Sequence, residues 1–346
     1  MPNAYPSTVT VNVGALSIED VVAVARYGAK VEIAPEALEE VAATRERVEE
    51  LAQDPTPVYG ISTGFGALAR RHIPEEMRAQ LQLSLVRSHA AGTGPEVEEE
   101  VIRALMLLRL STLCTGRTGV RPVVVETYAK ALNAGIVPVV REYGSLGCSG
   151  DLAPLAHCAL ALLGEGEVRV NGELKDASDA LAAAGIEPLQ LREKEGLALI
   201  NGTDGMLGQL CLAITDLRAA AKTADIATAM TVEGLLGTLV VFADDLQQLR
   251  PHPGQADAAA NILQVAEGSE ILEAALEEFK KNQVQDAYSV RCAPQVAGGF
   301  RDTLAHTAQV AERELAAAVD NPVVTKDGRV VSNGNFHGAP VAYALD

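Results

Sequence analysis

The chain has 346 residues, of which 48% are hydrophobic and 3% aromatic, and it contains no tryptophan. Its 46 acidic and 28 basic residues give a formal net charge of −18, which argues against binding to nucleic acid or to an anionic membrane, because both need a basic face. Five widely spaced cysteines without a C-x-x-C pair favour neither a disulfide framework nor a zinc site, and they fit a reducing cytoplasm.

The N-terminal part of the chain alternates short strands and helices. Residues 1–16 lack the basic start and apolar core of a signal peptide, and no apolar run approaches the ~20 residues that a membrane span needs. Alternation in "TVTVNV" predicts a strand at 8–13, and Ser17, three residues before Asp20, predicts a helix that starts with a capping box. Proline, glycine and apolar periodicity predict further helices beginning at residue 35 and spanning about 75–90, 95–113, 121–135 and 151–166, with a glycine-rich loop at 59–69.

The rest of the chain is dominated by long helical patterns. Asn171-Gly172 and Asp327-Gly328 predict β-hairpins at 168–174 and 323–331. Apolar periodicity predicts helices at 203–221, 222–249, 269–281 and 295–319. The sequence therefore predicts a mainly α fold with minor β structure.

The loop "GSLGCSGDLAPL" (144–155) contains a triplet with unusual chemical potential. Glycine has no Cβ, so the amide nitrogen of Gly150 can approach the carbonyl of Cys148 and close a five-membered ring. Loss of water follows, and Ser149 can lose its hydroxyl as a second water. The product is an exocyclic methylidene, which is an electrophile made from the backbone alone. The alternative is an ordinary helix-entry loop in which Ser149 or Asp151 caps the helix.

The surrounding motifs favour the cyclised loop. "GSLGCSGDLAPLAHCALALLGEG" resembles the signature of the aromatic amino acid ammonia-lyase family, whose members carry the cyclised group 4-methylidene-imidazol-5-one (MIO). Similar motifs follow in family order: "YGISTGFG" (59–66), "LSLVRSHAAGTG" (83–94), "EGLALINGT" (195–203), "VQDAYSVRCAPQV" (284–296), "DNPVV" (320–324) and "GNFHG" (334–338). The resemblance runs from about Ser7 to the last residue. It implies an MIO formed autocatalytically from Cys148-Ser149-Gly150, with no metal and no dissociable cofactor.

One departure from the family lies in the triplet itself. The family usually has alanine where this chain has Cys148. Because this residue contributes only its carbonyl and α-carbon to the ring, we expect cyclisation to be retained.

The resemblance also implies a domain organisation and an assembly. It implies an N-terminal MIO-loop domain with small β-hairpins at 1–200, followed at 201–346 by the long helices of a central helical bundle. "GNFHGAPVAYALD" begins a helix that stops at Asp346, so we expect this bundle to be incomplete at its C-terminal end and the chain alone to be poorly active. Family members are homotetramers, so we expect a homo-oligomer. The cysteine pattern described above leads us to expect it in the cytoplasm.

Four residues receive roles from the resemblance alone. Tyr59 is expected to be the base that removes the β-proton of the substrate. Arg291 is expected to hold the substrate carboxylate, for which a guanidinium fork is suited. Phe336 is expected to stack in the pocket, and Asp151 is expected to position the loop for ring closure. Considered singly, these side chains would be packing, capping or surface residues.

Four more residues bear on the amine and on substrate choice. Asn201, Gln285 and Tyr288 resemble the polar ring around the MIO and the substrate amine. His89 lies where family members that act on histidine carry the selecting residue, since an imidazole can exchange hydrogen bonds with the substrate imidazole. The resemblance therefore implies elimination of ammonia from L-histidine to give trans-urocanate. A tyrosine or phenylalanine ammonia-lyase, an aminomutase of the same family, and an inactive truncated helical assembly remain the alternatives.

Overall fold

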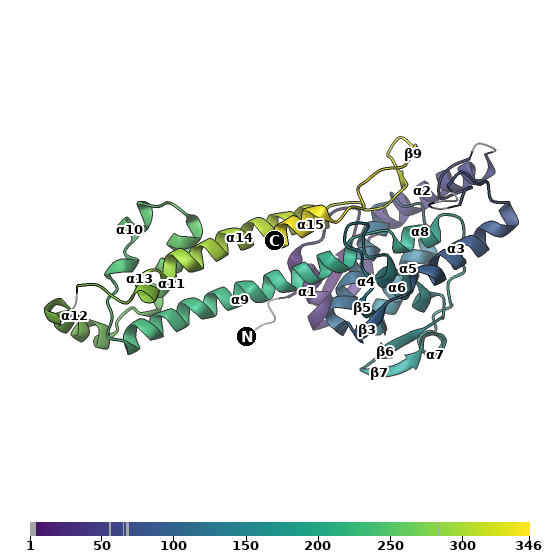
Figure 1. Ribbon diagram of the computed structural model, residues 1–346. Helices are drawn as coiled ribbons and strands as arrows, with labels where there is room; N and C mark the ends of the chain where they lie inside the picture. Colours follow the sequence, from purple (N-terminus) through teal and green to yellow (C-terminus); the bar gives the residue numbers. More distant parts are fainter. Residues whose placement is uncertain (1–4, 55–56, 65, 67–68, 283) are drawn as a thin grey trace. The chain divides into compact units, whose positions relative to one another are not determined.

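The computed structural model describes residues 5–54, 57–64, 66, 69–282 and 284–346 (Figure 1). The chain divides into two compact units, one formed by residues up to 212 together with 310–346, and the other by 213–309. The division into domains at 1–200 and 201–346 stays a prediction. The compact units differ from it in that residues 201–212 and 310–346 pack with the N-terminal part of the chain.

The first unit is mainly helical. Its helices are α1 (Ile18–Tyr27), α2 (Pro35–Gln53), α3 (Glu75–His89), α4 (Glu99–Cys114), α5 (Pro122–Asn133), α6 (Leu152–Leu162), α7 (Ala177–Ala183), α8 (Glu195–Ile200), α15 (Ala339–Leu345), the start of α9 (Asp204–Gly234) and the end of α14 (Ala293–Leu315). The capping box predicted for α1 is present, because the Ser17 hydroxyl accepts a hydrogen bond from the Asp20 amide at 3.0 Å and the Asp20 carboxylate accepts one from the Ser17 amide. The long helices and the mainly α character are confirmed.

Small two- and three-stranded sheets complete the first unit. Its strands are β1 (Thr8–Val11), β2 (Lys30–Ile33), β3 (Thr93–Glu96), β4 (Ile136–Pro138), β5 (Arg141–Tyr143), β6 (Glu167–Val170), β7 (Glu173–Asp176), β8 (Val323–Val324) and β9 (Val330–Val331). Strands β1 and β2 pair in parallel, and the other pairs, β3–β5, β4–β6, β6–β7 and β8–β9, are antiparallel. Both predicted hairpins are confirmed, and Asn171 and Gly172 both take the positive φ of a two-residue hairpin turn.

Several predicted helix boundaries are wrong. The helix predicted from Pro95 begins only at Glu99, because Thr93–Glu96 pair with β5. The predicted helices at 203–221 and 222–249 are one helix, α9, which ends at Gly234. The alanine-rich sequence around residue 221 favours an uninterrupted helix, and the chain leaves the helix only near Leu236, which has a positive φ. The predicted loop at 59–69 includes residues 65, 67 and 68, which lie outside the described residues.

Helix α4 forms the centre of the first unit. Every residue from Ala104 to Cys114 is buried, and the helix packs against α1, α2 and α5 (Figure 1). A helix that is buried on all sides normally carries only apolar side chains. This one also carries Arg109, whose guanidinium is fully buried and faces the segments described below.

The second unit contains the rest of α9 and α14 with shorter helices. These are the 3₁₀ helix η2 (Val240–Phe242), α10 (Asp244–Gln248), α11 (Pro253–Val265), α12 (Glu270–Asn282) and α13 (Tyr288–Arg291). Val232, Phe242, Ile262, Leu272 and Val290 belong to its apolar core.

One helical stretch corrects the expectation about apolar runs. Residues Glu195–Gly234 contain an 18-residue window that is long and apolar enough to span a membrane, and 83% of this window is buried inside the structure. It does not stand out as an apolar run in the sequence, because Asn201, Thr203 and Asp204 interrupt the apolar residues. Burial of this kind is also what the core helix of a globular domain shows.

Candidate functional site

A cavity of about 330 Å³ lies within the first unit. It is lined by Tyr59, Gly66, Leu85, His89, Ser149, Leu152, Leu197, Ile200, Asn201, Asn321 and Phe336. Five of these eleven are residues to which the sequence analysis assigned a role: Tyr59, His89, Ser149, Asn201 and Phe336. The structure therefore brings together side chains that are up to 277 positions apart in the sequence (from residue 59 to residue 336).

The loop that carries Ser149 is tightly folded. Gly147 and Gly150 have φ values of +61° and +87°, which side-chain-bearing residues rarely adopt. The Gly150 amide donates to the Gly147 carbonyl at 3.1 Å. A Cβ on Gly150 would lie 2.4 Å from the carbonyl oxygen of Gly202, so only glycine fits at this position. The half-buried Ser149 faces the cavity, whereas Cys148 is exposed.

Asp151 ties this loop to the N-terminus of α9. Its buried carboxylate accepts hydrogen bonds from the amides of Gly205 at 2.8 Å and Met206 at 3.0 Å, and from the Ser145 hydroxyl at 2.7 Å. Its own amide donates to the Gly202 carbonyl at 2.7 Å. Burial raises the pKa of Asp151, while the three hydrogen bonds favour the charged form. These contacts agree with the role predicted for Asp151 in positioning the loop.

Arg109 holds the segments behind the cavity. One terminal guanidinium nitrogen donates to the carbonyl of Asn201 at 2.9 Å, and the other donates to the carbonyl of Val319 at 3.0 Å. Its Nε lies 3.6 Å from Asp204 Oδ2, and neither atom has a hydrogen-bond partner in the described structure. Burial raises the pKa of Asp204 to about 6, and Arg109 opposes that shift. Neither residue was predicted from the sequence, although an arginine inside "ALMLLRLSTL" is a signal that polar groups surround it.

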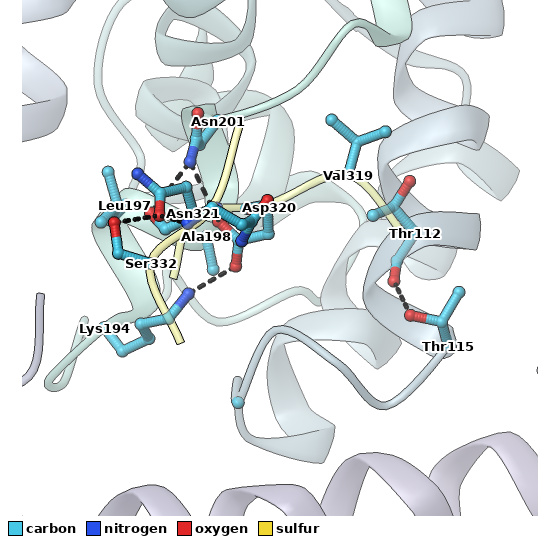
Figure 2. Close-up of polar contacts among 12 residues, drawn as sticks. Thr112, Thr115, Lys194, Leu197, Ala198, Asn201, Val319, Asp320, Asn321 and Ser332 are labelled. Atoms are coloured by element: carbon cyan, nitrogen blue, oxygen red, sulfur yellow. Dashed lines mark hydrogen bonds and ion pairs between the residues drawn. The ribbon is translucent and has the colours of Figure 1, made fainter. Parts of the chain in front are cut away.

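A second buried ion pair lies beside Asn201. Lys194 and Asp320 are both fully buried, and the Lys194 ammonium donates to Asp320 Oδ2 (Figure 2). Asn201 donates from Nδ2 to Asp320 Oδ1 at 3.2 Å and to the carbonyl of Asn321 at 3.0 Å. Asp320 lies in the family-like motif "DNPVV" but had no predicted role, and Lys194 was not predicted as a site residue. Opposite charges 126 positions apart give no local pattern that would pair them.

His89 lies at the end of α3 with one ring nitrogen engaged. Its Nδ1 is 2.9 Å from the carbonyl of Leu85 and 3.0 Å from the Ser88 hydroxyl. A carbonyl can only accept, so Nδ1 must carry a proton in this contact, and the tautomer with its single proton on Nδ1 leaves Nε2 as an acceptor. An acceptor at the cavity wall can receive a hydrogen bond from an N–H group of a ligand.

The remaining predicted site residues belong to the second unit. Gln285 is exposed, and Tyr288, at the start of α13, has an exposed fraction of 73%. Arg291 is partly buried, and its guanidinium carbon lies 5.2 Å from the centre of the Tyr288 ring. The structure thus places Tyr288 and Arg291 together, in a different compact unit from the cavity. In the part of the chain that the structure describes, no three His, Cys, Asp or Glu side chains are arranged to hold a metal ion.

Comparison with known proteins identifies similar chains. Residues 16–346 match the family model described as aromatic amino acid lyase. The chain is 63% identical over 340 residues to a histidine ammonia-lyase of Streptomyces avermitilis, covering 98% of this chain and 66% of that protein. It is 47% identical over 332 residues to a histidine ammonia-lyase of Gloeobacter violaceus, covering 96% of this chain and 64% of that protein. The chain therefore spans about two thirds of the length of these curated relatives.

Solved structures share the fold. The tyrosine aminomutase of Streptomyces globisporus superposes with a TM-score of 0.91 at 39% identity, covering 98% of this chain and 67% of that one. The histidine ammonia-lyase of Trypanosoma cruzi superposes with a TM-score of 0.88 at 38% identity, covering 98% and 63%. Proteins with lyase and with aminomutase names therefore share this backbone.

Proposed function

The chain belongs to the aromatic amino acid lyase family, and on this basis we propose that the protein eliminates ammonia from L-histidine to give trans-urocanate. One observation carries the proposal. In a chain 63% identical to a histidine ammonia-lyase, Ser149 of the Cys-Ser-Gly triplet and His89 line the same cavity.

The loop residues fit the prosthetic group that the family implies. Gly150 has no Cβ, and the Gly202 carbonyl leaves no room for one. The Ser149 side chain, which would become the methylidene carbon, faces the cavity. Asp151 and the glycines hold the loop in a tight bend, as ring closure between Gly150 and Cys148 requires. We infer that Cys148-Ser149-Gly150 forms the MIO, which when formed supplies an electrophile toward the substrate.

The side chains around the cavity have separate proposed roles toward the substrate. Tyr59 is the proposed base for the β-proton, which general base catalysis requires to lie within hydrogen-bond reach. The unprotonated Nε2 of His89 accepts the N–H of the substrate imidazole, and Phe336 packs against the ring. Arg291 does not line this cavity and belongs to the second unit, and its role as the partner of the substrate carboxylate rests on the family resemblance and on the fork geometry of its guanidinium.

The test of substrate choice is a turnover assay with L-histidine, L-tyrosine and L-phenylalanine. We expect the rise in ultraviolet absorbance of urocanate from L-histidine, with free ammonia in equal amount. His89→Leu should lower kcat/KM for histidine by about 10- to 100-fold, the value of one lost hydrogen bond to a polar ligand group. Unchanged kinetics in this variant would remove His89 from the site, and a preference of the wild type for phenylalanine or tyrosine would reject the proposed substrate.

The alternatives are separated by the products. An aminomutase returns the ammonia to the β-carbon, so it would produce a β-amino acid in place of free ammonia. An inactive helical assembly would produce neither, with any of the three amino acids. A tyrosine aminomutase shares the fold at 39% identity, so product analysis is needed beside the absorbance assay.

Assembly and location are also proposals. We infer a cytoplasmic homo-oligomer with a free amino acid as the small-molecule partner. All five cysteines are free thiols in the structure, which fits a reducing compartment. Size-exclusion chromatography with light scattering measures the assembly, and a monomer would reject it.

A further inference from the structure

The amide of Asn201 can take only one orientation in this structure. Its two side-chain contacts beyond the cavity are the Asp320 carboxylate at 3.2 Å and the Asn321 carbonyl at 3.0 Å. Both are acceptors, so only the amide NH₂ can face them. The opposite orientation would put three oxygens together without a proton between them.

This orientation leaves the oxygen of Asn201 for the cavity. Asn201 lines the cavity, and among the described residues its Oδ1 accepts no hydrogen bond. Figure 2 shows two dashed lines from the amide nitrogen of Asn201, one to Asp320 and one to Asn321. The group that Asn201 offers to a ligand is therefore an acceptor.

Lys194 maintains the acceptor character of Asp320. A protonated Asp320 could donate a hydrogen bond and release the Asn201 amide, whereas a charged carboxylate only accepts. Lys194 is fully buried and makes its side-chain contact with Asp320 Oδ2, while Oδ1 accepts from the Asn201 side chain and from the Asn321 amide at 2.7 Å. A buried carboxylate of this kind needs a paired cation.

Residues 332 and 333 also form hydrogen bonds with the segment that contains Asp320 and Asn321. Asn321 Oδ1 accepts from the Ser332 hydroxyl at 3.0 Å and from the Asn333 amide at 2.9 Å. The Asn333 side chain donates to the carbonyl of Asp320 at 3.1 Å. The position of Asp320 is thus fixed independently of Asn201, so Asp320 can orient the amide without following it.

We propose that Lys194 and Asp320 are positioning residues that hold the Asn201 carbonyl oxygen toward the cavity, where it accepts a hydrogen bond from the ammonium group of the amino acid substrate. The inference rests on the proposed function, because it assumes an amino acid in this cavity. An ammonium group is the part of such a ligand that only donates, whereas its carboxylate only accepts and would be repelled.

The test compares two ligands that differ by the ammonium group. The Ser149→Ala protein cannot form the MIO, so it binds without turnover, and its affinities for L-histidine and 3-(imidazol-4-yl)propanoate are measured by calorimetry. In this background, Asp320→Asn should weaken histidine binding by about 10-fold or more, because one hydrogen bond to a charged group is lost. Binding of the deamino ligand should change less than about 2-fold, since it has no ammonium group.

Two further variants keep the test decisive. Lys194→Met should give the same ligand-selective loss, because it leaves Asp320 without its cation. If neither buried variant folds, Asn201→Ala tests the orientation directly, and it should remove the histidine-selective part of the affinity. The matched control is Asp179→Asn, a substitution of an exposed carboxylate on α7, which should change neither affinity.

The outcomes separate this inference from the proposed function. Equal loss of both ligands in the variants, or no loss of histidine binding, would overturn the positioning role. If histidine does not bind the Ser149→Ala protein, the proposed substrate is wrong. The comparison is then made with phenylalanine and 3-phenylpropanoate. The positioning role requires that the variants weaken binding of phenylalanine more than binding of 3-phenylpropanoate.

Discussion

The proposed site residues fall into two groups with opposite environments. In the first unit, Asn201 and the loop of Ser149 lie beside fully buried charged side chains whose hydrogen bonds join α4, α8 and residues 319–321. In the second unit, Gln285 and Tyr288 are exposed, and the contact recorded between Tyr288 and Arg291 is local. Asn201 in the first group is held by buried hydrogen bonds before any ligand binds, whereas Gln285 and Tyr288 in the second group are exposed.

The difference indicates that the first unit is less stable than it could be, because buried charges surround its cavity. Burying Arg109, Asp204, Lys194 and Asp320 is costly unless each charge is paired, and a buried ion pair stabilises less than apolar packing of the same volume. The gain is a cavity wall whose polar groups cannot reorient. Changes to these buried charges or to the backbone beside them should therefore disturb both fold and activity, and changes in the second group should disturb activity alone.

Ser149→Ala should produce the largest effect on turnover and leave the fold intact. The hydroxyl of Ser149 is half-buried and is lost as water in ring closure, so its removal prevents formation of the electrophile. We expect urocanate production to fall by at least ~10³-fold, equivalent to about 4 kcal/mol of activation free energy. The far-ultraviolet circular dichroism and the melting temperature should match those of the wild type. Residual turnover above one tenth would contradict the role of Ser149.

Gly202→Ala should produce the largest loss of stability. A Cβ at this position would lie 2.1 Å from Asp204 Oδ2 and 2.8 Å from a terminal nitrogen of Arg109, and both side chains are buried. We expect the free energy of unfolding in urea to fall by about 3 kcal/mol or more, as ~1–3 kcal/mol is typical of overpacking without buried charges.

A glycine in the second unit provides the matched control for Gly202→Ala. Gly299 lies in α14, where an added methyl group would meet no heavy atom within 4 Å, so Gly299→Ala should raise the free energy of unfolding by ~0.5–1 kcal/mol. Equal effects of the two substitutions would mean that the buried charges in the first unit do not constrain the backbone.

Asp204 should give the stability of the first unit a distinctive pH dependence. Its folded-state pKa of about 6 lies above the ordinary value of 3.8, so the folded protein keeps a proton that the unfolded chain releases. The contribution of Asp204 to stability is therefore greatest below about pH 4 and falls as the pH rises through about 6. Since Asn does not titrate, the difference in unfolding free energy between the wild type and Asp204→Asn should fall by on the order of 3 kcal/mol over this range.

Urea unfolding at a series of pH values measures this difference. The control is Asp257→Asn, an exposed position in the second unit, which should keep the pH dependence of the wild type. A difference between wild type and Asp204→Asn that is constant from pH 4 to 7 would show that Asp204 is not held in a protonation-sensitive site.

Tyr288→Phe should have the smallest effect on stability. The side chain is 73% exposed, and an exposed substitution away from special features changes the free energy of unfolding by less than ~0.5 kcal/mol. Turnover should nevertheless fall, whereas Tyr143→Phe, a similarly exposed position in the first unit, should leave turnover unchanged. A loss of stability above ~1 kcal/mol would contradict the contrast between the two groups, and unchanged turnover would remove Tyr288 from the site.

Local sequence patterns predicted those parts of the fold that local interactions determine. The capping box at Ser17 and the turn at Asn171-Gly172 depend on neighbouring residues, and both are confirmed. Strand β3 was missed because its partner β5 lies more than forty residues away, and the pairing overrides the helix signal at Pro95. Helix α9 was predicted as two helices although its alanine-rich middle favours a continuous helix, so the local sequence was sufficient at this position.

Local sequence patterns are limited in the same way for the site. Glycine chemistry indicated the triplet from the residues themselves, but Tyr59, His89 and Phe336 were proposed by resemblance, and the structure places all three at one cavity. Lys194 and Asp320 were not predicted, because Lys194 stands in a run of charged residues that looks like a solvated surface segment, and only the folded chain pairs it with Asp320. What sequence reasoning lacks here is the pairing of distant buried charges.

The central claim is that Cys148-Ser149-Gly150 is converted to an electrophile, and the intact mass of the purified protein tests it most directly. Ring closure and dehydration of Ser149 each remove one water. The account predicts a wild-type mass lower by two waters than the sequence requires, and a Ser149→Ala mass that is not lower by two. A wild-type protein at the full mass of its sequence would contradict the claim.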